Sequence, residues 1–273
     1  MMTPLIDIYA TRLRAAGRSP YTISTRCRVL RQADRSMPNG LVEATPDDII
    51  DFLADRQAAW SRSTCYAHLH GFYTAMVAAE RMLADPTDRV DRPKCGDRIA
   101  DPVSNHHLSI AIADSPDLPW RLAVVLAAYA GLRCCEICGL LREDVTEEHV
   151  HVRHGKGDKG RYIPTHPLVW AQVAHRPAGP LVLSARGRPI TPERLSGAQH
   201  QHWVRVGLPG FHLHQGRAWF ATTLADQGVG IEVIQELMGH ARIETTRGYM
   251  RVSVVRQRAA LLSLPITGAP AGL

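Results

Sequence analysis

The sequence lacks any run of apolar residues that could span a membrane. A transmembrane helix needs about 20 such residues in succession, and the apolar stretches here are broken well before that length. The N-terminal segment MMTPLIDIYATRLRAAGR also lacks the uninterrupted apolar core of a secretory signal peptide. We therefore expect a cytoplasmic protein with no membrane partner, and its 273 residues allow two modest domains with separate cores.

The spacing typical of metal ligands is also missing. Three of the six cysteines, Cys134, Cys135 and Cys138, cluster on one expected helix, but no second CxxC and no HxxxH follows at zinc-finger spacing. Reduced thiols are the ordinary state of cysteine in the cytosol. The sequence therefore predicts no metal and no other cofactor, and a zinc module stays open only as an alternative.

Lysine is almost absent, because the chain has three lysines against twenty-nine arginines. The net charge of +6 and the pI near 9.2 suit a polyanionic partner. Seven arginines lie in the first 40 residues, whereas residues 43–55 are acidic. This uneven split favours a pair of DNA-facing helices over a mixed, solvated face. The expected contacts here are Arg12, Arg14, Arg18, Arg26, Arg28 and Arg31.

Helical periodicity and helix-start signals predict a four-helix domain at residues 1–85. Ser-Pro-Tyr-Thr at 19–22 and Thr-Pro-Asp-Asp at 45–48 each offer a capping hydroxyl followed by proline. The stretch 86–102 is rich in Pro, Asp and Arg and indicates an interdomain linker, after which a second domain is expected at 103–251. The four expected helices span 4–16, 20–36, 47–60 and 61–83.

Residues 211–251 predict three helices. Trp219, Phe220, Thr223 and Leu224 form an apolar face over 216–227, a second helix runs over 231–238, and two threonines cap a third. Four polar side chains lie at the ends or on one face of these helices, namely His214, Arg217, His240 and Tyr249.

This set of side chains favours chemistry at phosphorus. It lacks the carboxylate pair or the Ser or Cys nucleophile of carboxyl chemistry. Guanidinium groups match the non-bridging oxygens of a phosphorane bidentately. A tyrosine beside a base and in a cationic field can attack a phosphodiester.

The motifs HQGRAWFATTLADQG and LMGHARIETTRGY resemble the C-terminal signature of the tyrosine recombinase (phage integrase) family. In that signature a histidine stands three residues before an arginine, which selects His214 over His212. The resemblance implies a mainly α fold with a small antiparallel β-sheet, built from a four-helix core-binding (SAM-like) domain and a C-terminal tyrosine recombinase catalytic domain. Because the chain starts almost at the first core-binding helix, we expect a small integrase without an arm-binding N-terminal domain.

GLRCCEICGLLREDV resembles the first arginine box of the same family. The resemblance implies that Arg133 holds the scissile phosphate and that Glu136 supports it. An ordinary helix salt bridge is the alternative. Arg133 stands where a buried helix meets a glycine, and a charge at such a place is energetically unfavourable. This favours a functional role for Arg133 over an ordinary salt bridge.

The segment GKGDKG predicts a β-hairpin, with strands at 150–154 and 161–164. Lysine can give up a proton, which arginine cannot do in a protein, so a lysine suits the protonation of a leaving 5′-oxygen. The family's hairpin carries such a lysine, which implies that role for Lys156. A basic turn that touches backbone phosphates is the alternative, and Lys159 and Arg161 are expected DNA contacts.

The resemblance implies site-specific recombination through a 3′-phosphotyrosyl intermediate without ATP. Phage integration and excision is the first expectation, and Xer-like chromosome or plasmid resolution is the alternative. A type IB topoisomerase-like enzyme and a non-catalytic DNA-binding regulator stay open after these. The implied catalytic set is Arg133, Lys156, His214, Arg217, His240 and Tyr249, with Glu136 supporting.

The implied partners are double-stranded DNA attachment sites, three further copies of the chain in a homotetramer on DNA, and an accessory directionality factor. The expected location is the bacterial cytoplasm, associated with the nucleoid. Residues 252–273 begin with an amphipathic helix, and an exposed apolar tail usually finds a partner. We expect it to dock on a neighbouring subunit, with folding back on its own domain as the alternative.

Overall fold

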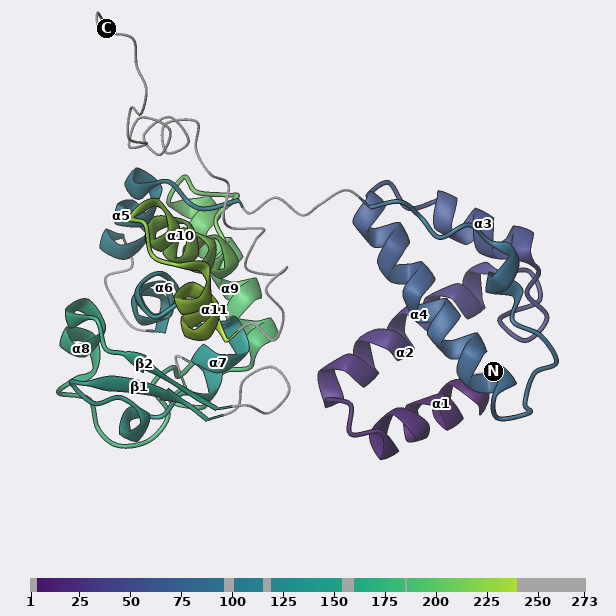
Figure 1. Cartoon of the computed structure of the whole chain (residues 1–273), viewed down its shortest axis with the longest axis horizontal. Helices are drawn as coiled ribbons and strands as arrows, with labels where there is room; N and C mark the ends of the chain where they lie inside the picture. Colours follow the sequence, from purple (N-terminus) through teal and green to yellow (C-terminus); the bar gives the residue numbers. More distant parts are fainter. Residues whose placement is uncertain (1–3, 96–100, 115–118, 154–159, 185, 240–273) are drawn as a thin grey trace, which may run out of the picture. The chain divides into compact units, whose positions relative to one another are not determined.

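The chain forms two compact units, Met1–Asp97 and Arg98–Leu273, each with its own core. The computed structural model describes residues 4–95, 101–114, 119–153, 160–184 and 186–239 (Figure 1). These residues are mainly helical, with a two-stranded antiparallel sheet, so the expected fold class is confirmed. None of the described helices has the length and apolar character needed to cross a membrane.

The first unit contains the four expected helices, α1 (Pro4–Ala15), α2 (Pro20–Ser36), α3 (Pro46–Ala54) and α4 (Ala59–Val77). Both start signals act as predicted. The Ser19 hydroxyl accepts from the Thr22 amide at 3.2 Å, and Thr45 forms a reciprocal capping box with Asp48. The third helix ends at Ala54, six residues before the expected end at 60.

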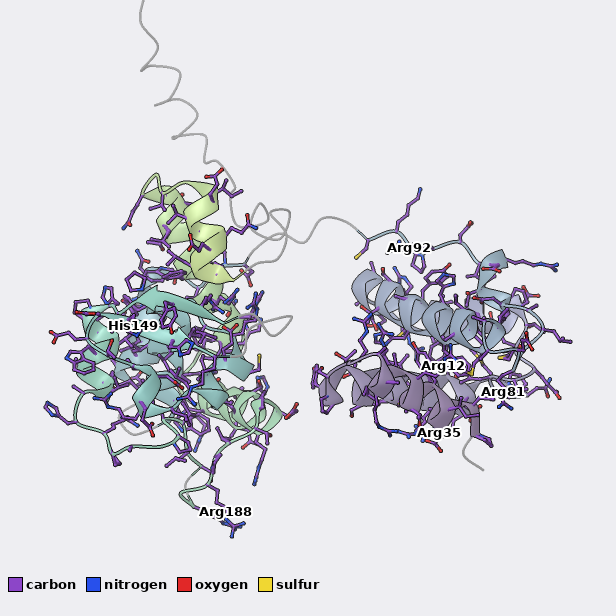
Figure 2. All side chains as sticks on the ribbon, turned by 60° about the horizontal axis from the view of Figure 1, so that its bottom comes forward. Arg12, Arg35, Arg81, Arg92, His149 and Arg188 are labelled. Atoms are coloured by element: carbon purple, nitrogen blue, oxygen red, sulfur yellow. The ribbon has the colours of Figure 1, made fainter. Side chains whose placement is uncertain are left out.

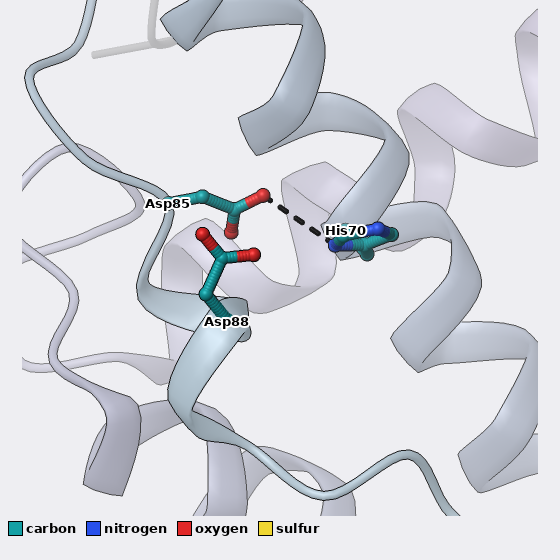
Figure 3. Close-up of side chains that lie close together, drawn as sticks. All are labelled: His70, Asp85 and Asp88. Carbon is teal, nitrogen blue, oxygen red and sulfur yellow. Dashed lines mark ion pairs between the residues drawn. The ribbon is translucent and has the colours of Figure 1, made fainter.

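Residues 85–90 pack on the first unit, which corrects the expected start of the linker. Asp85 accepts from the Thr87 amide at 2.9 Å and so begins a 3₁₀ turn, η1 (Pro86–Arg89). Thr87 is fully buried, and its hydroxyl lies 2.8 Å from His70 Nδ1 on α4. His70 Nδ1 lies 3.4 Å from Asp85 Oδ2. Figure 3 shows this pair with Asp88 beside it. This side-chain cluster joins η1 to α4.

The second unit is organised around α6 (Pro119–Tyr129), whose residues 122–128 are all buried. Helices α5 (Asn105–Ala113), α7 (Cys134–Gly139), α8 (Pro167–Val173) and α10 (Leu213–Asp226) each contact α6 (Figure 1). Helix α9 (Pro192–Arg205) packs on α7, and α11 (Ile231–Met238) packs on α10. A 3₁₀ turn, η2 (Arg142–Asp144), leads toward the sheet.

The sheet is the predicted hairpin, with β1 (His149–Val152) antiparallel to β2 (Arg161–Pro164). Val150 faces Ile163 and Val152 faces Arg161 across the ladder. Opposite residues of an antiparallel pair point to the same side. Because Val150, Val152 and Ile163 are buried, Arg161 also points into the unit rather than to solvent.

Helix α10 packs through small residues in addition to its expected apolar face, whose residues Trp219, Phe220 and Leu224 lie against the core. Ala218, Ala221 and Ala225 are buried, whereas Trp219 and Phe220 are half-buried. Gly216 brings the α10 backbone close to Ala127 of α6, because an added Cβ would lie 3.5 Å from the Ala127 Cβ. The Phe220 ring instead packs against the turn that follows α6.

We predict that replacing Gly131 in that turn destabilises the second unit. Gly131 has φ +61°, and a Cβ there would lie 2.7 Å from the Phe220 ring. A left-handed alanine alone costs about 1–2 kcal/mol, and the clash adds to it. Gly131→Ala should therefore lower the melting temperature by roughly 4 °C or more in a thermal circular-dichroism scan.

Gly216→Ala is the matched control for this substitution. Its new methyl group makes an ordinary contact with Ala127, and alanine is favoured over glycine inside a helix by about 0.5–1 kcal/mol. Its melting temperature should equal or exceed that of the parent. Equal melting of Gly131→Ala and the parent would contradict the assignment of Gly131 as a required glycine.

Candidate active site

Arg133 and Glu136 meet at the start of α7. Arg133 is the N-cap residue of this helix, and its backbone amide donates to Glu136 Oε2 at 2.9 Å. Its guanidinium Nη1 donates to Glu136 Oε1 at 2.8 Å. The Glu136 side chain is 1% exposed and that of Arg133 is 22% exposed, so this i,i+3 pair is more buried than the ordinary helix salt bridge considered as an alternative.

The Glu136 carboxylate is shared by two further arginines. Arg161 of β2 binds it bidentately, with both nitrogen–oxygen distances at 2.9 Å. Arg217 of α10 lies 3.9 Å from Oε2 and is 2% exposed. Three guanidinium groups and one carboxylate give this arginine cluster, defined as Arg133, Arg161, Arg217 and Glu136, a formal charge of +2.

The same three arginines hold the C-terminal end of α11. The last carbonyl groups of a helix lack intrahelical donors and carry partial negative charge. Three consecutive carbonyls of this end each accept from a different guanidinium. The pairs are Arg161 with Leu237 (3.0 Å), Arg217 with Met238 (2.6 Å) and Arg133 with Gly239 (3.1 Å). Arg217 also donates to the Gly131 carbonyl, which ties α10 to the turn after α6.

His214 lies on the first turn of α10, three residues before Arg217. The two side chains differ in exposure, since Arg217 is buried and His214 is exposed. An exposed imidazole beside a buried guanidinium can reach a ligand that approaches the cluster from solvent. The role of His214 as a proton acceptor stays a prediction.

The remaining expected catalytic residues, Lys156, His240 and Tyr249, lie outside the described residues, as does the expected DNA contact Lys159 and the tail 252–273. His240 directly follows Gly239, whose carbonyl Arg133 holds. Their catalytic roles stay predictions.

The structure gives Arg161, an expected DNA contact, partners inside the second unit, and its contact with DNA stays a prediction. Its side chain is 10% exposed, and each guanidinium nitrogen has a partner inside the unit. The alternation of RYIP could have revealed this, because Arg161 shares its face with the buried Ile163 while Tyr162 is 64% exposed. Arg161 is thus the member of the cluster that sequence reasoning missed.

The arginines of the first unit are mostly exposed, as a DNA-facing surface requires. Arg12, Arg14, Arg18 and Arg28 are exposed; Arg12 on α1 and Arg35 on α2 can be followed in Figure 2. A cleft of about 550 Å³ between α1 and α2 is lined in part by Arg14, Arg18 and Arg31. Arg26 differs, because its guanidinium donates to the Tyr9 hydroxyl at 3.0 Å.

Glu136 should link the stability of the second unit to pH. Burial raises the pKa of Glu136, but hydrogen bonds and charge from Arg161 and Arg133 outweigh it and lower the pKa from 4.5 to about 2. A lowered pKa stabilises the fold above pH 4.5, and this stabilisation is lost as pH falls toward 2. The shift in pKa corresponds to about 3 kcal/mol in the free energy of unfolding of the second unit.

We predict that Glu136→Gln, which mimics the protonated side chain, melts roughly 6–12 °C below the parent at pH 7. The difference should shrink as pH falls from 4.5 to about 2. Thermal scans across this range measure it, with Glu147→Gln as an exposed control that melts like the parent. A difference that stays constant with pH would contradict the role of Glu136 as a buried anion.

Comparison with known proteins places this geometry in a family. Residues 104–256 match the model of the phage integrase family. The tyrosine recombinase XerC of Mycobacterium tuberculosis (strain ATCC 25177 / H37Ra) is 32% identical over 215 residues, which cover 68% of this chain and 71% of that protein.

Two solved structures share the fold at low identity. The Tn1549 transposon integrase in complex with a circular intermediate DNA gives a TM-score of 0.71 at 19% identity and covers 97% of this chain and 100% of its own. The lambda integrase tetramer bound to a Holliday junction gives 0.64 at 19% identity, with 88% of this chain and 77% of that one covered. The family match and the XerC relative together show that this chain belongs to the phage integrase family, the tyrosine recombinases.

Proposed function

We propose that this tyrosine recombinase cuts and rejoins DNA at specific sites through a 3′-phosphotyrosyl intermediate, in phage integration and excision. The observation that carries the proposal is the arginine cluster, with a formal charge of +2 on mostly buried side chains. It lies where the chain leads directly into His240, nine residues before Tyr249. A phosphate ester is the anion that such a site suits.

Strand cleavage exchanges one phosphate ester bond for another. The Tyr249 oxygen forms a bond to the scissile phosphorus while the bond to the 5′-oxygen breaks. His214 accepts the phenolic proton, and Lys156 supplies a proton to the leaving 5′-oxygen. The phosphotyrosyl bond conserves the energy of the ester, so the 5′-hydroxyl of a second duplex can attack it and complete the exchange.

Arg133 and Arg217 bind the non-bridging oxygens in this scheme, and His240 donates a hydrogen bond to them. Both guanidinium groups are fixed before DNA arrives, Arg133 by Glu136 and Gly239 and Arg217 by Met238. Donors that are already oriented need no reorganisation in the transition state, and one such donor is typically worth about 10²–10³ in rate.

Double-stranded DNA and three further copies of the chain are the proposed partners. The DNA complexes of the Tn1549 and lambda integrases support this, as does the lambda tetramer on its junction. The tail 252–273 is proposed to dock on the neighbouring subunit, and an accessory factor is proposed to set direction. The first unit is the proposed core-binding domain, residues 1–85 extended by η1, in a cytoplasmic enzyme.

Xer-like resolution of chromosome or plasmid dimers is the second candidate, because the curated relative is named XerC. The two functions differ in the sites that recombine. A resolution enzyme joins two copies of one site, whereas an integrase joins two different sites. Plasmids that carry either pair of sites, incubated with the purified protein, distinguish them by the product formed.

Tyr249→Phe is predicted to abolish the covalent protein–DNA adduct, because phenylalanine has no oxygen to bond to phosphorus. A pool of nicked duplexes of randomised sequence provides the substrate, and denaturing gels detect the adduct. Tyr162→Phe is the matched control, since its ring is 64% exposed on the outer face of the hairpin, and it should form adduct like the parent. Adduct formation by Tyr249→Phe would contradict the proposal.

Arg14→Gln/Arg18→Gln is predicted to weaken DNA binding without changing its sequence preference. Each neutralised phosphate contributes about one unit to the slope of log affinity against log salt, so the slope should fall by about two. Arg26→Gln, whose guanidinium already donates to Tyr9, should change the slope less. Mobility-shift titrations at several salt concentrations test this, and an unchanged slope in the double variant would contradict it.

A further inference from the structure

Arg161 joins three elements of the second unit, β2, α7 and α11, through one side chain. It stands at the first position of β2, five residues after Lys156 in the sequence. Its two terminal nitrogens bind both oxygens of Glu136 on α7, and its Nε donates to the Leu237 carbonyl at the end of α11. The hairpin, α7 and α11 are therefore held by a single guanidinium.

Gly239 allows this close approach. It ends α11 in the left-handed conformation, with φ 60°. A Cβ on Gly239 would lie 2.8 Å from Arg161 Nη1 and 3.0 Å from Cδ, a separation that real Cβ atoms rarely show. The backbone of α11 thus packs directly on the guanidinium of β2, which explains why Arg161 is 10% exposed.

Arg161 also decides how the charge of the cluster is distributed. Glu136 Oε1 accepts from Arg133 at 2.8 Å and from Arg161 at 2.9 Å, so the two arginines share one anion. Arg161 engages both oxygens through terminal nitrogens, whereas Arg133 engages one in this way and is 22% exposed. Arg161 is the stronger partner of Glu136 in this geometry.

We propose that Arg161 is a positioning residue for strand cleavage. It compensates the charge of Glu136 and anchors the end of α11, so that the positive charges of Arg133 and Arg217 stay available to the scissile phosphate. This inference rests on the proposed function and adds a residue to it. Arg161 itself need not touch DNA. Its effect on the reaction passes through Glu136 and the carbonyl of Leu237.

Loss of Arg161 has a specific consequence for the charge. Glu136 would then be compensated by Arg133 and Arg217 alone, and the formal charge of the cluster would fall from +2 to +1. Arg133 would be drawn toward the carboxylate rather than toward a phosphate. Removing the charge of Glu136 as well should restore a formal charge of +2 and release Arg133.

The test compares covalent adduct formation by four proteins on nicked duplexes captured by the parent from a randomised pool. Arg161→Gln should form adduct about 100-fold more slowly than the parent, the size expected for a lost electrostatic contact. The double variant Arg161→Gln/Glu136→Gln should recover about tenfold over Arg161→Gln. Affinity for intact duplex should stay within about threefold for both, because Arg161 acts through Glu136 and the Leu237 carbonyl rather than through a phosphate contact of its own.

Arg153→Gln is the matched control. Arg153 follows β1 of the same hairpin and pairs with the buried carboxylate of Asp144, so its loss disturbs the hairpin without touching Glu136. Adduct formation by this variant should stay within about threefold of the parent. Where Arg161→Gln does not fold, Arg161→Lys replaces it. Lysine keeps the charge but not the fork, and adduct formation should fall about tenfold.

Three results would overturn the inference. The first is a parental rate in Arg161→Gln or Arg161→Lys. The second is a double variant no faster than Arg161→Gln, because a merely structural role would not be relieved by removing Glu136. The third is an equal loss in Arg153→Gln. Failure of the proposed function looks different, since the parent itself would then form no adduct or Tyr249→Phe would form as much.

Discussion

The second unit depends on the ion pairs and hydrogen bonds that the Glu136 carboxylate forms with three arginines. A buried carboxylate is strongly unfavourable unless cations and hydrogen-bond donors surround it. Here hydrogen-bond donors come from the start of α7 and from β2, and a further cation comes from α10; these elements lie far apart in the sequence. Because one buried anion needs several partners, Glu136 fixes the relative positions of α7, β2 and α10. These positions set the arrangement of guanidinium groups that a phosphate would meet.

The end of α11 completes this arrangement from the opposite side. Its carbonyl groups at 237, 238 and 239 supply partial negative charge to the same three guanidinium groups. Small residues on α10 bring its neighbours close. Gly216 lets α10 approach α6, and the buried alanines of α10 pack with Ile234 and Met238 of α11. Arg217 of α10 then donates to the Gly131 carbonyl in the turn after α6. Packing and electrostatics thus impose the same geometry.

Local signals were sufficient to predict the four helices of the first unit, α10, α11 and the hairpin, whereas the support of Arg133 by Glu136 was implied by the family resemblance. Caps and proline positions act within one turn of a helix, so Ser19 and Thr45 could be interpreted directly from the sequence. The contacts of Arg161 with Glu136 and Leu237 were missed because these partners lie 25 and 76 residues away. The buried alanines of α10 were missed for a related reason, since burial of alanine depends on a neighbouring helix that periodicity does not reveal.

The excess of positive charge gives the cluster a direct energetic link to its ligand. Three guanidinium groups that are buried or half-buried repel one another, and one carboxylate with a few helix carbonyls compensates them only in part. A phosphate that enters this site would supply the missing negative charge, so binding and folding are stabilised by the same interaction. The arrangement that prepares the cluster for a DNA phosphate is therefore also one that leaves the unliganded second unit less stable than its apolar core alone would make it.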